Sequence, residues 1–257
     1  MSSTRSAAEG DRDATPLPRY LQLMWGVEQG GRRGPKPGRS IGDIGAAAVA
    51  VADRDGLAGV SMKSVATELG LTTMSLYRYV DSKDELYAVM LDTAYGSPEP
   101  SLTARGNWRT RLEKWARAIA AVRLEHPWTV TVPLREPPAT PNTARWTESG
   151  LQAFAATKLS AQQRFSALLL IDGFVQHHIR QSLQLGFVSE TGQPGAGTDN
   201  YPENLYSVAD PQEFPHLLAG AEEAMDPADD DDFFATELDF GLRTILDGIA
   251  AQVDAAR

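Results

Sequence analysis

The stretch SMKSVATELGLTTMSLYRYVDSKDEL, from Ser61 to Leu86, decides the fold of this chain. Ser61 can cap a short helix, and Gly70 can end that helix in a left-handed turn. Thr72 or Thr73 can then cap a second short helix, which carries small polar and aromatic residues. A helix, a turn that contains glycine and a second short helix form the arrangement of a helix-turn-helix unit.

Capping signals on both sides of this stretch predict two more helices. Ser40 and Asp43 have the form of a capping box, and the helix that they begin ends at the sequence DGLAG. Ser82 and Glu85 have the same form at the start of KDELYAVMLDTAYG. The sequence therefore predicts four short helices in a helix-turn-helix DNA-binding domain over residues 40–96.

The second helix of the unit has the residue types that reading DNA requires. An α-helix fits the major groove, where residues near its N-terminus meet base edges and must be short and either polar or methyl-bearing. Three residues meet this need: Thr73, Met74 and Ser75. Three longer residues can reach phosphates or outlying bases: Tyr77, Arg78 and Tyr79. Leu76 and Val80 recur at helical spacing and are expected to face the core.

The same stretch resembles the signature of the tetracycline-repressor (TetR) family. The family pattern has a helix of small residues, a glycine turn, two aromatic residues separated by one position, and a lysine that begins the next helix. The matching residues are Ala66, Gly70, Tyr77, Tyr79 and Lys83. The resemblance implies an N-terminal three-helix DNA-binding module and an all-helical C-terminal domain for dimerisation and inducer binding.

By this resemblance, eight residues occupy positions that contact DNA in the family. They are Lys63, Thr73, Met74, Ser75, Tyr77, Arg78, Tyr79 and Lys83. Tyr77 and Lys83 are expected on phosphates. A structural interpretation also stays open, because both tyrosines could be core aromatics and Met74 could pack instead of reading a thymine methyl. Lys83 stands at the positive end of a helix dipole, where a cation is unfavourable. A DNA phosphate bound nearby would explain why a lysine occupies this position.

The remainder of the chain, residues 101–257, also has a helical pattern and is expected to form the regulatory domain for ligand binding and dimerisation. A helix is expected over residues 145–157. The helices over residues 160–185 and 233–253 are apolar on more than one side, so their own domain cannot bury them fully. We expect them to pair with their symmetry mates as a four-helix bundle in a homodimer. The predicted fold class is all-α.

The first 39 residues are rich in Pro, Gly, Ser and charge, and residues 1–39 are expected to form a flexible basic N-terminal arm. One apolar island, YLQLMWG from Tyr20 to Gly26, could be a short helix docked on the body or a disordered segment. The basic residues after it are Arg32, Arg33, Lys36 and Arg39. They could make a solubilising tail or lie along the minor groove.

The net charge of −10 lies mostly outside the helix-turn-helix part. Residues 1–95 hold 11 Lys and Arg against 12 Asp and Glu, whereas residues 96–257 hold 13 against 22. Binding to DNA phosphates depends on the cations near the contact. The acidic total therefore does not exclude nucleic acid as a partner.

Several classes of function are disfavoured. The chain has no cysteine, which excludes disulfides, thiolate metal sites and cysteine nucleophiles. It has no secretory signal and no apolar run near the roughly 18 residues of a membrane span, so we expect a cytoplasmic protein without a membrane partner. No hydrolase, metalloprotease or phosphate-loop motif appears, and Asp172 and His177 are not spaced to share a helix face. We expect no catalytic residue, no cofactor and no metal.

Large residues of the C-terminal domain could line an apolar ligand pocket. The expected ligand neighbours are Trp128, Trp146, Phe174 and His178. The predicted function is that of a ligand-responsive repressor, released from a palindromic operator in double-stranded DNA by a small hydrophobic inducer. One alternative is a helical small-molecule-binding protein or enzyme with a vestigial helix-turn-helix. Another is a ligand-independent DNA organiser or an activator of the same fold.

Overall fold

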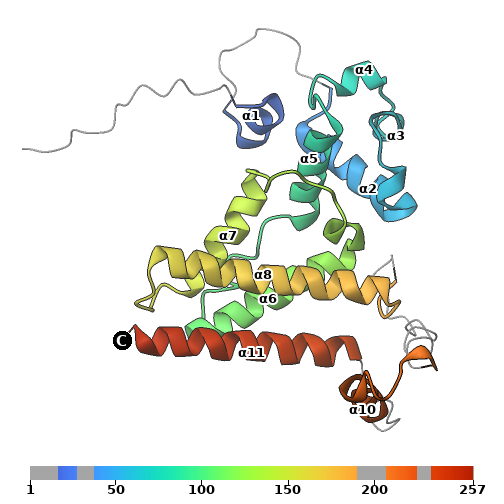
Figure 1. Cartoon of the computed structure of the whole chain (residues 1–257). Helices are drawn as coiled ribbons and strands as arrows, with labels where there is room; N and C mark the ends of the chain where they lie inside the picture. The colour runs from blue at the N-terminus through green and yellow to red at the C-terminus, as the bar shows by residue number, and fades with distance from the viewer. Residues whose placement is uncertain (1–16, 28–37, 190–206, 225–232, 257) are drawn as a thin grey trace, which may run out of the picture.

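The computed structural model describes residues 17–27, 38–189, 207–224 and 233–256, and the regular structure in these residues is helical. No β-strand occurs in the described ranges, so the predicted all-α fold class is confirmed. Figure 1 shows a smaller group of helices built from the N-terminal part of the chain above a larger C-terminal group. Two apolar clusters are buried in these groups. No helix in the described part of the chain has the length and apolar character that crossing a bilayer requires.

The first group contains helices whose starts agree with the capping signals. They are α2 (Ile41–Gly59), α3 (Met62–Glu68), α4 (Thr73–Leu76) and α5 (Lys83–Tyr95). The backbone N–H of Asp43 donates to the Ser40 hydroxyl, and the backbone N–H of Ser40 donates to the Asp43 carboxylate, so this capping box forms as predicted. Thr72, rather than Thr73, caps α4. Gly56 has a φ of 69°, and helical geometry is interrupted there, within the predicted DGLAG end.

The capping box predicted at the start of α5 forms only in part. The N–H of Glu85 donates to the Ser82 hydroxyl at 3.1 Å, as expected. The Glu85 carboxylate accepts the N–H of Asp81 at 2.6 Å and makes no reciprocal bond to Ser82. Burial raises the pKa of this carboxyl. Glu85 therefore fixes the turn between α4 and α5 instead of closing the box.

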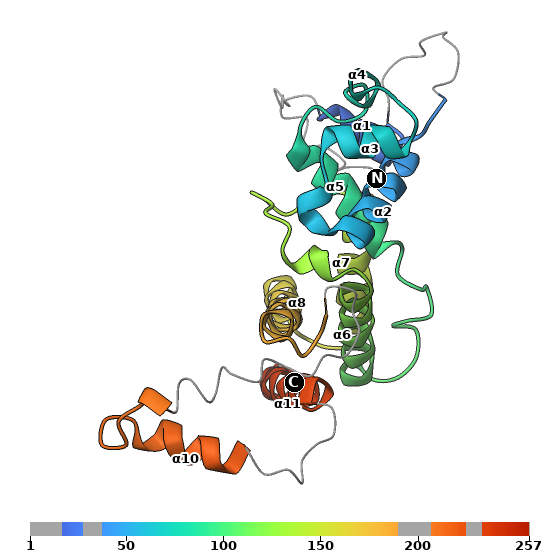
Figure 2. The same ribbon diagram turned by 90° about the vertical axis from the view of Figure 1, so that its right-hand side faces the viewer.

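The second group is built from the helices of the C-terminal part of the chain. They are α6 (Trp108–Glu125), the 3₁₀ helix η1 (Pro127–Val130), α7 (Pro141–Ala153), α8 (Ala161–Gln184), α10 (Pro215–Ala224) and α11 (Phe233–Ala255). α8 and α11 lie side by side and antiparallel, and α6 packs against both (Figures 1 and 2). α7 begins at Pro141 and not at residue 145, because proline is favoured at the first helical position, where its missing N–H costs nothing.

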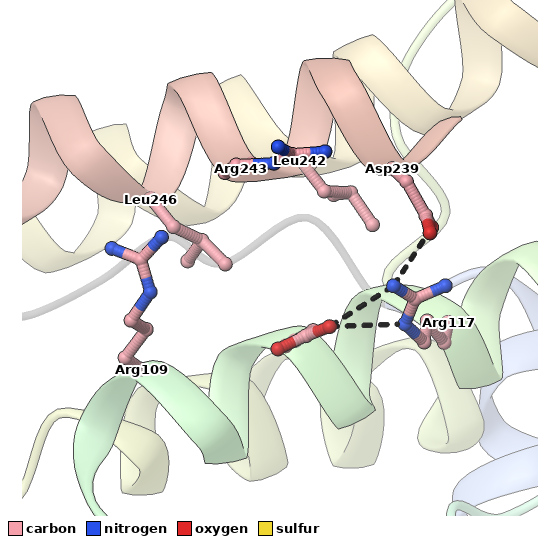
Figure 3. A pocket seen from close by; sticks show the side chains of 7 residues that line it. Arg109, Arg117, Asp239, Leu242, Arg243 and Leu246 are labelled. Atoms are coloured by element: carbon pink, nitrogen blue, oxygen red, sulfur yellow. Dashed lines mark hydrogen bonds and ion pairs between the residues drawn. The ribbon is translucent and has the colours of Figure 1, made fainter. Parts of the chain in front are cut away.

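Two surface ion pairs join α6 to α11. Arg109 pairs with Asp247 at 2.7 Å, and Arg117 pairs with Asp239 at 2.8 Å. Figure 3 shows the guanidinium of Arg117 reaching from α6 toward Asp239, with Leu242 on the same turn of α11. Exposed pairs of this kind contribute about 0–1 kcal/mol each. The buried apolar side chains between the two helices therefore hold them together more than the ion pairs do.

A buried carboxylate of the first group caps a helix of the second. Asp92 on α5 accepts the backbone N–H of Asn142 at 2.7 Å and the side-chain amide of Asn142 at 3.1 Å. Asn142 lies in the first turn of α7, where N–H groups lack helical partners and negative charge is favoured. The N-cap residue Thr140 makes no capping bond with its own side chain. Asp92 thus fixes the start of α7 relative to α5.

Part of the predicted flexible arm is a helix. α1 (Arg19–Trp25) packs against α2 and buries Leu21, so of the two alternatives for Tyr20 to Gly26 the structure has the docked helix. Gly26, with a φ of 64°, ends α1 in the left-handed conformation. The expectation of a flexible arm over residues 1–39 therefore does not hold for α1. Residues 1–16 and 28–37, which include Arg32, Arg33 and Lys36, lie outside the described residues.

Candidate DNA-binding surface and ligand cavity

The second helix of the helix-turn-helix, α4, lies at the end of the molecule remote from α11 (Figure 1). Leu76 and Val80 are fully buried and anchor it, as predicted. Met74 is 75% exposed and Tyr77 is 43% exposed, so neither side chain belongs to the core. A short, anchored helix with outward side chains is the geometry that major-groove reading requires.

Four further predicted contact residues surround these two. Lys63 on α3 and Arg78 after α4 are exposed, whereas Thr73 and Ser75 are half-buried. The Ser75 hydroxyl lies 2.9 Å from the hydroxyl of the cap residue Thr72. The side chain of Ser75 therefore takes part in the cap of α4 and still has access to solvent on the same side.

Lys83 is the first residue of α5 and is exposed. Its Nζ lies 5.2 Å from the centre of the Tyr87 ring, which is a cation–π contact. Because the N-terminus of a helix disfavours a cation, this contact offsets part of an unfavourable position. The ammonium group stays at the surface.

Tyr79 has a structural role in addition to any contact with DNA. Its ring is half-buried, and its hydroxyl donates to the backbone oxygen of Arg39 at 2.9 Å. The Arg39 guanidinium donates to the backbone oxygen of Leu69 at 3.2 Å. Tyr79 therefore holds Arg39, which precedes the N-cap of α2, against the helix-turn-helix. The interpretation as a packing aromatic describes Tyr79 better than Tyr77.

A cavity of about 1130 Å³ lies among α6, α7 and α8. Five of its lining residues are aromatic: Trp25, Tyr95, Trp115, Trp146 and Phe165. Residues of the segment that joins η1 to α7 supply another part of its wall. Pockets that bind small molecules have volumes of about 300–1,000 Å³ and mostly apolar walls with a few polar groups. The cavity is slightly larger than this range, and its largely apolar lining with a few polar groups is that of such a site.

A buried arginine network supplies some of the polar groups of the cavity. Arg123 on α6, only 4% exposed, donates to the Asp172 carboxylate at 2.7 Å, to the Asp172 backbone oxygen at 3.1 Å and to the Tyr95 hydroxyl at 3.0 Å. Burial alone would lower the pKa of Arg123, but Tyr95 and Asp172 outweigh it and hold the pKa above its ordinary value. The guanidinium is therefore charged, and it ties α6 to α8 and to the end of α5.

Comparison with known protein families identifies both parts of the chain. Residues 44–90 match the model described as bacterial regulatory proteins, tetR family, and residues 99–253 match the tetracyclin repressor-like C-terminal domain. The chain belongs to the TetR family. Members of this family are transcription regulators and not enzymes, so the alternative of an enzyme with a vestigial helix-turn-helix is set aside.

Similar proteins include a repressor and structures with and without ligand. The HTH-type transcriptional repressor DrrR1 of Streptomyces coeruleorubidus is 34% identical over 261 residues, which cover 99% of this chain and 92% of that protein. The structure of ActR of Streptomyces coelicolor with actinorhodin matches with a TM-score of 0.67 and 20% identity, over 84% of this chain and 99% of ActR. Apo ActR matches with a TM-score of 0.66 and 21% identity, over 86% and 99%. These structures share the fold.

In this TetR-family chain, the four predicted ligand neighbours do not form one site. Trp146 lines the cavity, and its indole N–H donates to the backbone oxygens of Tyr95 and Gly96. Phe174 and His178 instead stack on each other, with their ring centres 5.8 Å apart, and face α11. The reason is close packing, because a Cβ on Gly241 of α11 would collide with the Phe174 ring.

His178 belongs to the contact between α8 and α11. Its ring lies 4.5 Å from the Phe234 ring, and Nε2 lies 3.1 Å from the Phe234 backbone oxygen. Burial lowers the pKa of His178, although the bond to this oxygen acts in the opposite direction. Neutral His178 is therefore a packed core residue that does not line the cavity.

Trp128 lies at the joint between the two groups of helices. Its indole N–H donates to the Asp53 carboxylate on α2 at 2.7 Å, and Nδ1 of His126 lies 2.9 Å from the same oxygen. His126 is the residue at which α6 ends. Trp128 thus fastens the end of α6 and η1 to the DNA-binding helices, and it is not a lining residue of the cavity.

Another polar candidate of α8, Asp172, has a structural explanation. Asp172 pairs with buried Arg123, and no cluster of three or more metal-ligating residues occurs among the described residues. Sequence reasoning missed Arg123, Tyr95 and Trp25. An arginine on the apolar face of the helix at residues 108–125 was the available signal for Arg123. No local signal marked Trp25 as a lining residue.

Proposed function

We propose that this TetR-family regulator is a homodimeric repressor that leaves a palindromic operator when a small hydrophobic inducer occupies the cavity among α6, α7 and α8. One observation carries the proposal: the α6 wall of the cavity ends at His126, which bonds to Asp53 of the DNA-binding helices. The similarity to the repressor DrrR1 and the actinorhodin complex of ActR support it. A repressor acts where its operator lies, so we place the protein in the cytoplasm.

The DNA-binding surface of the proposal consists of exposed and half-buried residues of α3, of α4 and the turn after it, and of the start of α5. They are Lys63, Thr73, Met74, Ser75, Tyr77, Arg78, Tyr79 and Lys83. Residues at the start of α4 read base edges, with exposed Met74 suited to a thymine methyl. Tyr77 and Lys83 bind phosphates, which position the helix but carry no sequence information.

Replacement of Lys83 by alanine tests the phosphate contact. A dimer would lose two charge contacts, so the slope of log affinity against log salt should become shallower by about 1.8. Tyr77→Phe should weaken binding by about tenfold or more, because hydrogen bonds to charged groups are lost, but should leave the slope unchanged since the hydroxyl is neutral. Fluorescence anisotropy with a random duplex and with DNA from upstream of the protein's own gene measures both quantities.

The control for this experiment is Lys114→Ala, which removes an exposed cation from α6, far from α4. For each test variant, the affinity for the random duplex and the affinity for the upstream duplex should fall by the same factor, because phosphate contacts do not depend on sequence. If Lys83→Ala binds with the slope of the wild type, the ammonium does not contact a phosphate.

The proposed dimer forms through the outer faces of α8 and α11. Leu170 on α8 is 55% exposed and Phe240 on α11 is 62% exposed, although both helices are otherwise packed. A Cβ on Gly173 or on Gly248 would meet nothing within 4 Å, so each glycine leaves open space at the surface of its helix. Exposed apolar side chains beside small residues suit close packing of four helices, two from each protomer.

The proposed coupling follows α6. Trp115, Ile119 and Arg123 of α6 line the cavity, and the last turn leads to His126. An inducer that displaces α6 would act on α2 through the bonds of His126 and Trp128 to Asp53. Rotation of the DNA-binding helices changes the spacing of two recognition helices, and the inducer acts only if it binds one spacing more tightly.

Asp53→Ala should separate inducer binding from DNA release. Asp53 is not among the proposed DNA contacts, so DNA affinity without inducer should stay within about threefold of the wild type. The ratio of DNA affinities without and with inducer should fall toward one, because the coupling between the two sites is lost. A compound that releases DNA from the wild type in the anisotropy assay supplies the inducer. Arg54→Ala, next along α2 and paired only at the surface, is the control. Full inducer response in Asp53→Ala would exclude this route.

A further inference from the structure

The helix α1 contacts the DNA-binding helices on one side. Leu21 is buried, and Tyr20 and Met24 pack against the apolar cluster that contains α2 and α5. Burial raises the pKa of the Tyr20 hydroxyl, with a smaller effect from Glu85 on α5 and Glu136 on the segment before α7. α1 therefore lies where the DNA-binding helices and the wall of the cavity approach each other.

On its other side α1 contacts the cavity through one residue. Trp25 lines the cavity, and its indole N–H donates to the backbone oxygen of Ala139 at 2.9 Å. Ala139 and its neighbours Pro137 and Pro138 also line the cavity. The Trp25 side chain remains 47% exposed, which places it at the rim, between the interior and solvent.

The position of Trp25 is set by the end of its helix. Gly26 takes the left-handed conformation, and the N–H of Val27 donates to the Gln22 backbone oxygen at 3.0 Å. This closing turn holds the last residue of α1 against Ala139. A displacement of Trp25 would therefore be a displacement of α1, which also packs against α2 and the apolar cluster of the DNA-binding helices.

We infer that Trp25 is a residue of the ligand site and that α1 is a wall of this site that packs on the DNA-binding helices. The inference builds on the proposed function and adds a contact between ligand and DNA module through α1, besides the α5 residues that line the cavity and the route along α6. The ligand class that fits is a flat aromatic molecule, because the Trp25 ring at the rim continues the aromatic lining formed by Tyr95, Trp115 and Trp146.

The probe for the test is 1-anilinonaphthalene-8-sulfonate, an aromatic dye whose fluorescence rises in apolar sites, titrated into the purified full-length chain. Trp25→Ala should bind the dye about tenfold more weakly than the wild type, because an aromatic contact is lost. Trp25→Phe keeps an aromatic face and should bind within about threefold of the wild type. Leu17→Ala, an exposed residue near α1 that does not line the cavity, should bind as the wild type does.

A fourth variant separates failure of this inference from failure of the proposed function. Leu151→Trp places a larger side chain in the cavity and should abolish dye binding. If Leu151→Trp abolishes binding but Trp25→Ala binds as tightly as the wild type, the inference about α1 is wrong and the cavity stands. If the wild type does not bind the dye, or Leu151→Trp binds it equally well, the cavity is not a ligand site and both proposals fall.

Hydrogen exchange supplies a second readout that does not need a variant. The backbone amides of residues 19–27 in the wild type should exchange more slowly when the dye is bound, because the ligand then rests against Trp25. Residues 62–68 of α3, which do not line the cavity, serve as the internal reference. Unchanged exchange in residues 19–27 at saturating dye would overturn the role given to α1.

Discussion

A Phe240→Arg variant should be a folded monomer that has lost most of its affinity for operator DNA. Phe240 is largely exposed on α11, so its replacement leaves the core of the protomer intact. In the dimer the arginine would meet its symmetry mate in an apolar interface, where buried like charges oppose association. Without the dimer, each recognition helix binds alone, and the loss of linkage weakens binding by about 10²- to 10⁴-fold. Analytical ultracentrifugation and anisotropy measure the two effects.

Two controls isolate the role of this face. Phe240→Leu keeps an apolar side chain and should remain dimeric with nearly unchanged DNA affinity. Ala121→Arg adds the same charge to an exposed position on α6 and should also remain dimeric. A Phe240→Arg protein that sediments as a dimer would show that the protomers associate through another surface.

Arg123→Met should lower the free energy of unfolding by about 3 kcal/mol, the lower end of the range for breaking a buried ion pair. Methionine fills most of the space but leaves Asp172 and the Tyr95 hydroxyl without their donor. The loss of stability falls at the lower end of this range because the Asp172 side chain is 36% exposed, so water can hydrate its carboxylate once the arginine is removed. Urea denaturation followed by far-UV circular dichroism gives the free energy from the midpoint and slope.

Arg117→Met is the matched control, since the same residue type on the same helix pairs with Glu113 and Asp239 at the surface. It should cost no more than about 1 kcal/mol, as expected for exposed ion pairs. Equal stability of the two variants would mean that the Arg123 network does not hold α6 against α8.

Local signals in the sequence were sufficient for most helix starts and for the helix-turn-helix. The serines at residues 40, 61 and 160 cap α2, α3 and α8, because each hydroxyl accepts a backbone N–H three residues later. These bonds depend only on neighbouring residues, so their pattern is visible in the sequence. At the start of α7 the local signal is Pro141 at the first helical position, whereas the capping bond comes from Asp92, which is distant along the chain.

The ligand cavity was less predictable for the same reason. The size and apolar character of Trp128, Phe174 and His178 predict that they pack in the interior, but they do not show what covers them. The structure covers Trp128 with α2, and Phe174 and His178 with α11. Only Trp146 of the four lines the cavity, whereas Trp25 reaches it from the part of the chain expected to be a flexible arm. Contacts between distant segments decide a cavity, and one sequence does not contain them.

Selection of bound duplexes from a random-sequence library by the purified protein, followed by sequencing, tests the central claim most directly. A two-fold dimer that reads DNA with two α4 helices should enrich a near-palindrome whose half-site centres are about one helical turn, or a multiple of it, apart. The same selection with Phe240→Arg should lose the second half-site. Failure of the wild-type protein to enrich any sequence, with retention no greater than that of a protein without a helix-turn-helix, would contradict the account of this chain as a sequence-specific repressor.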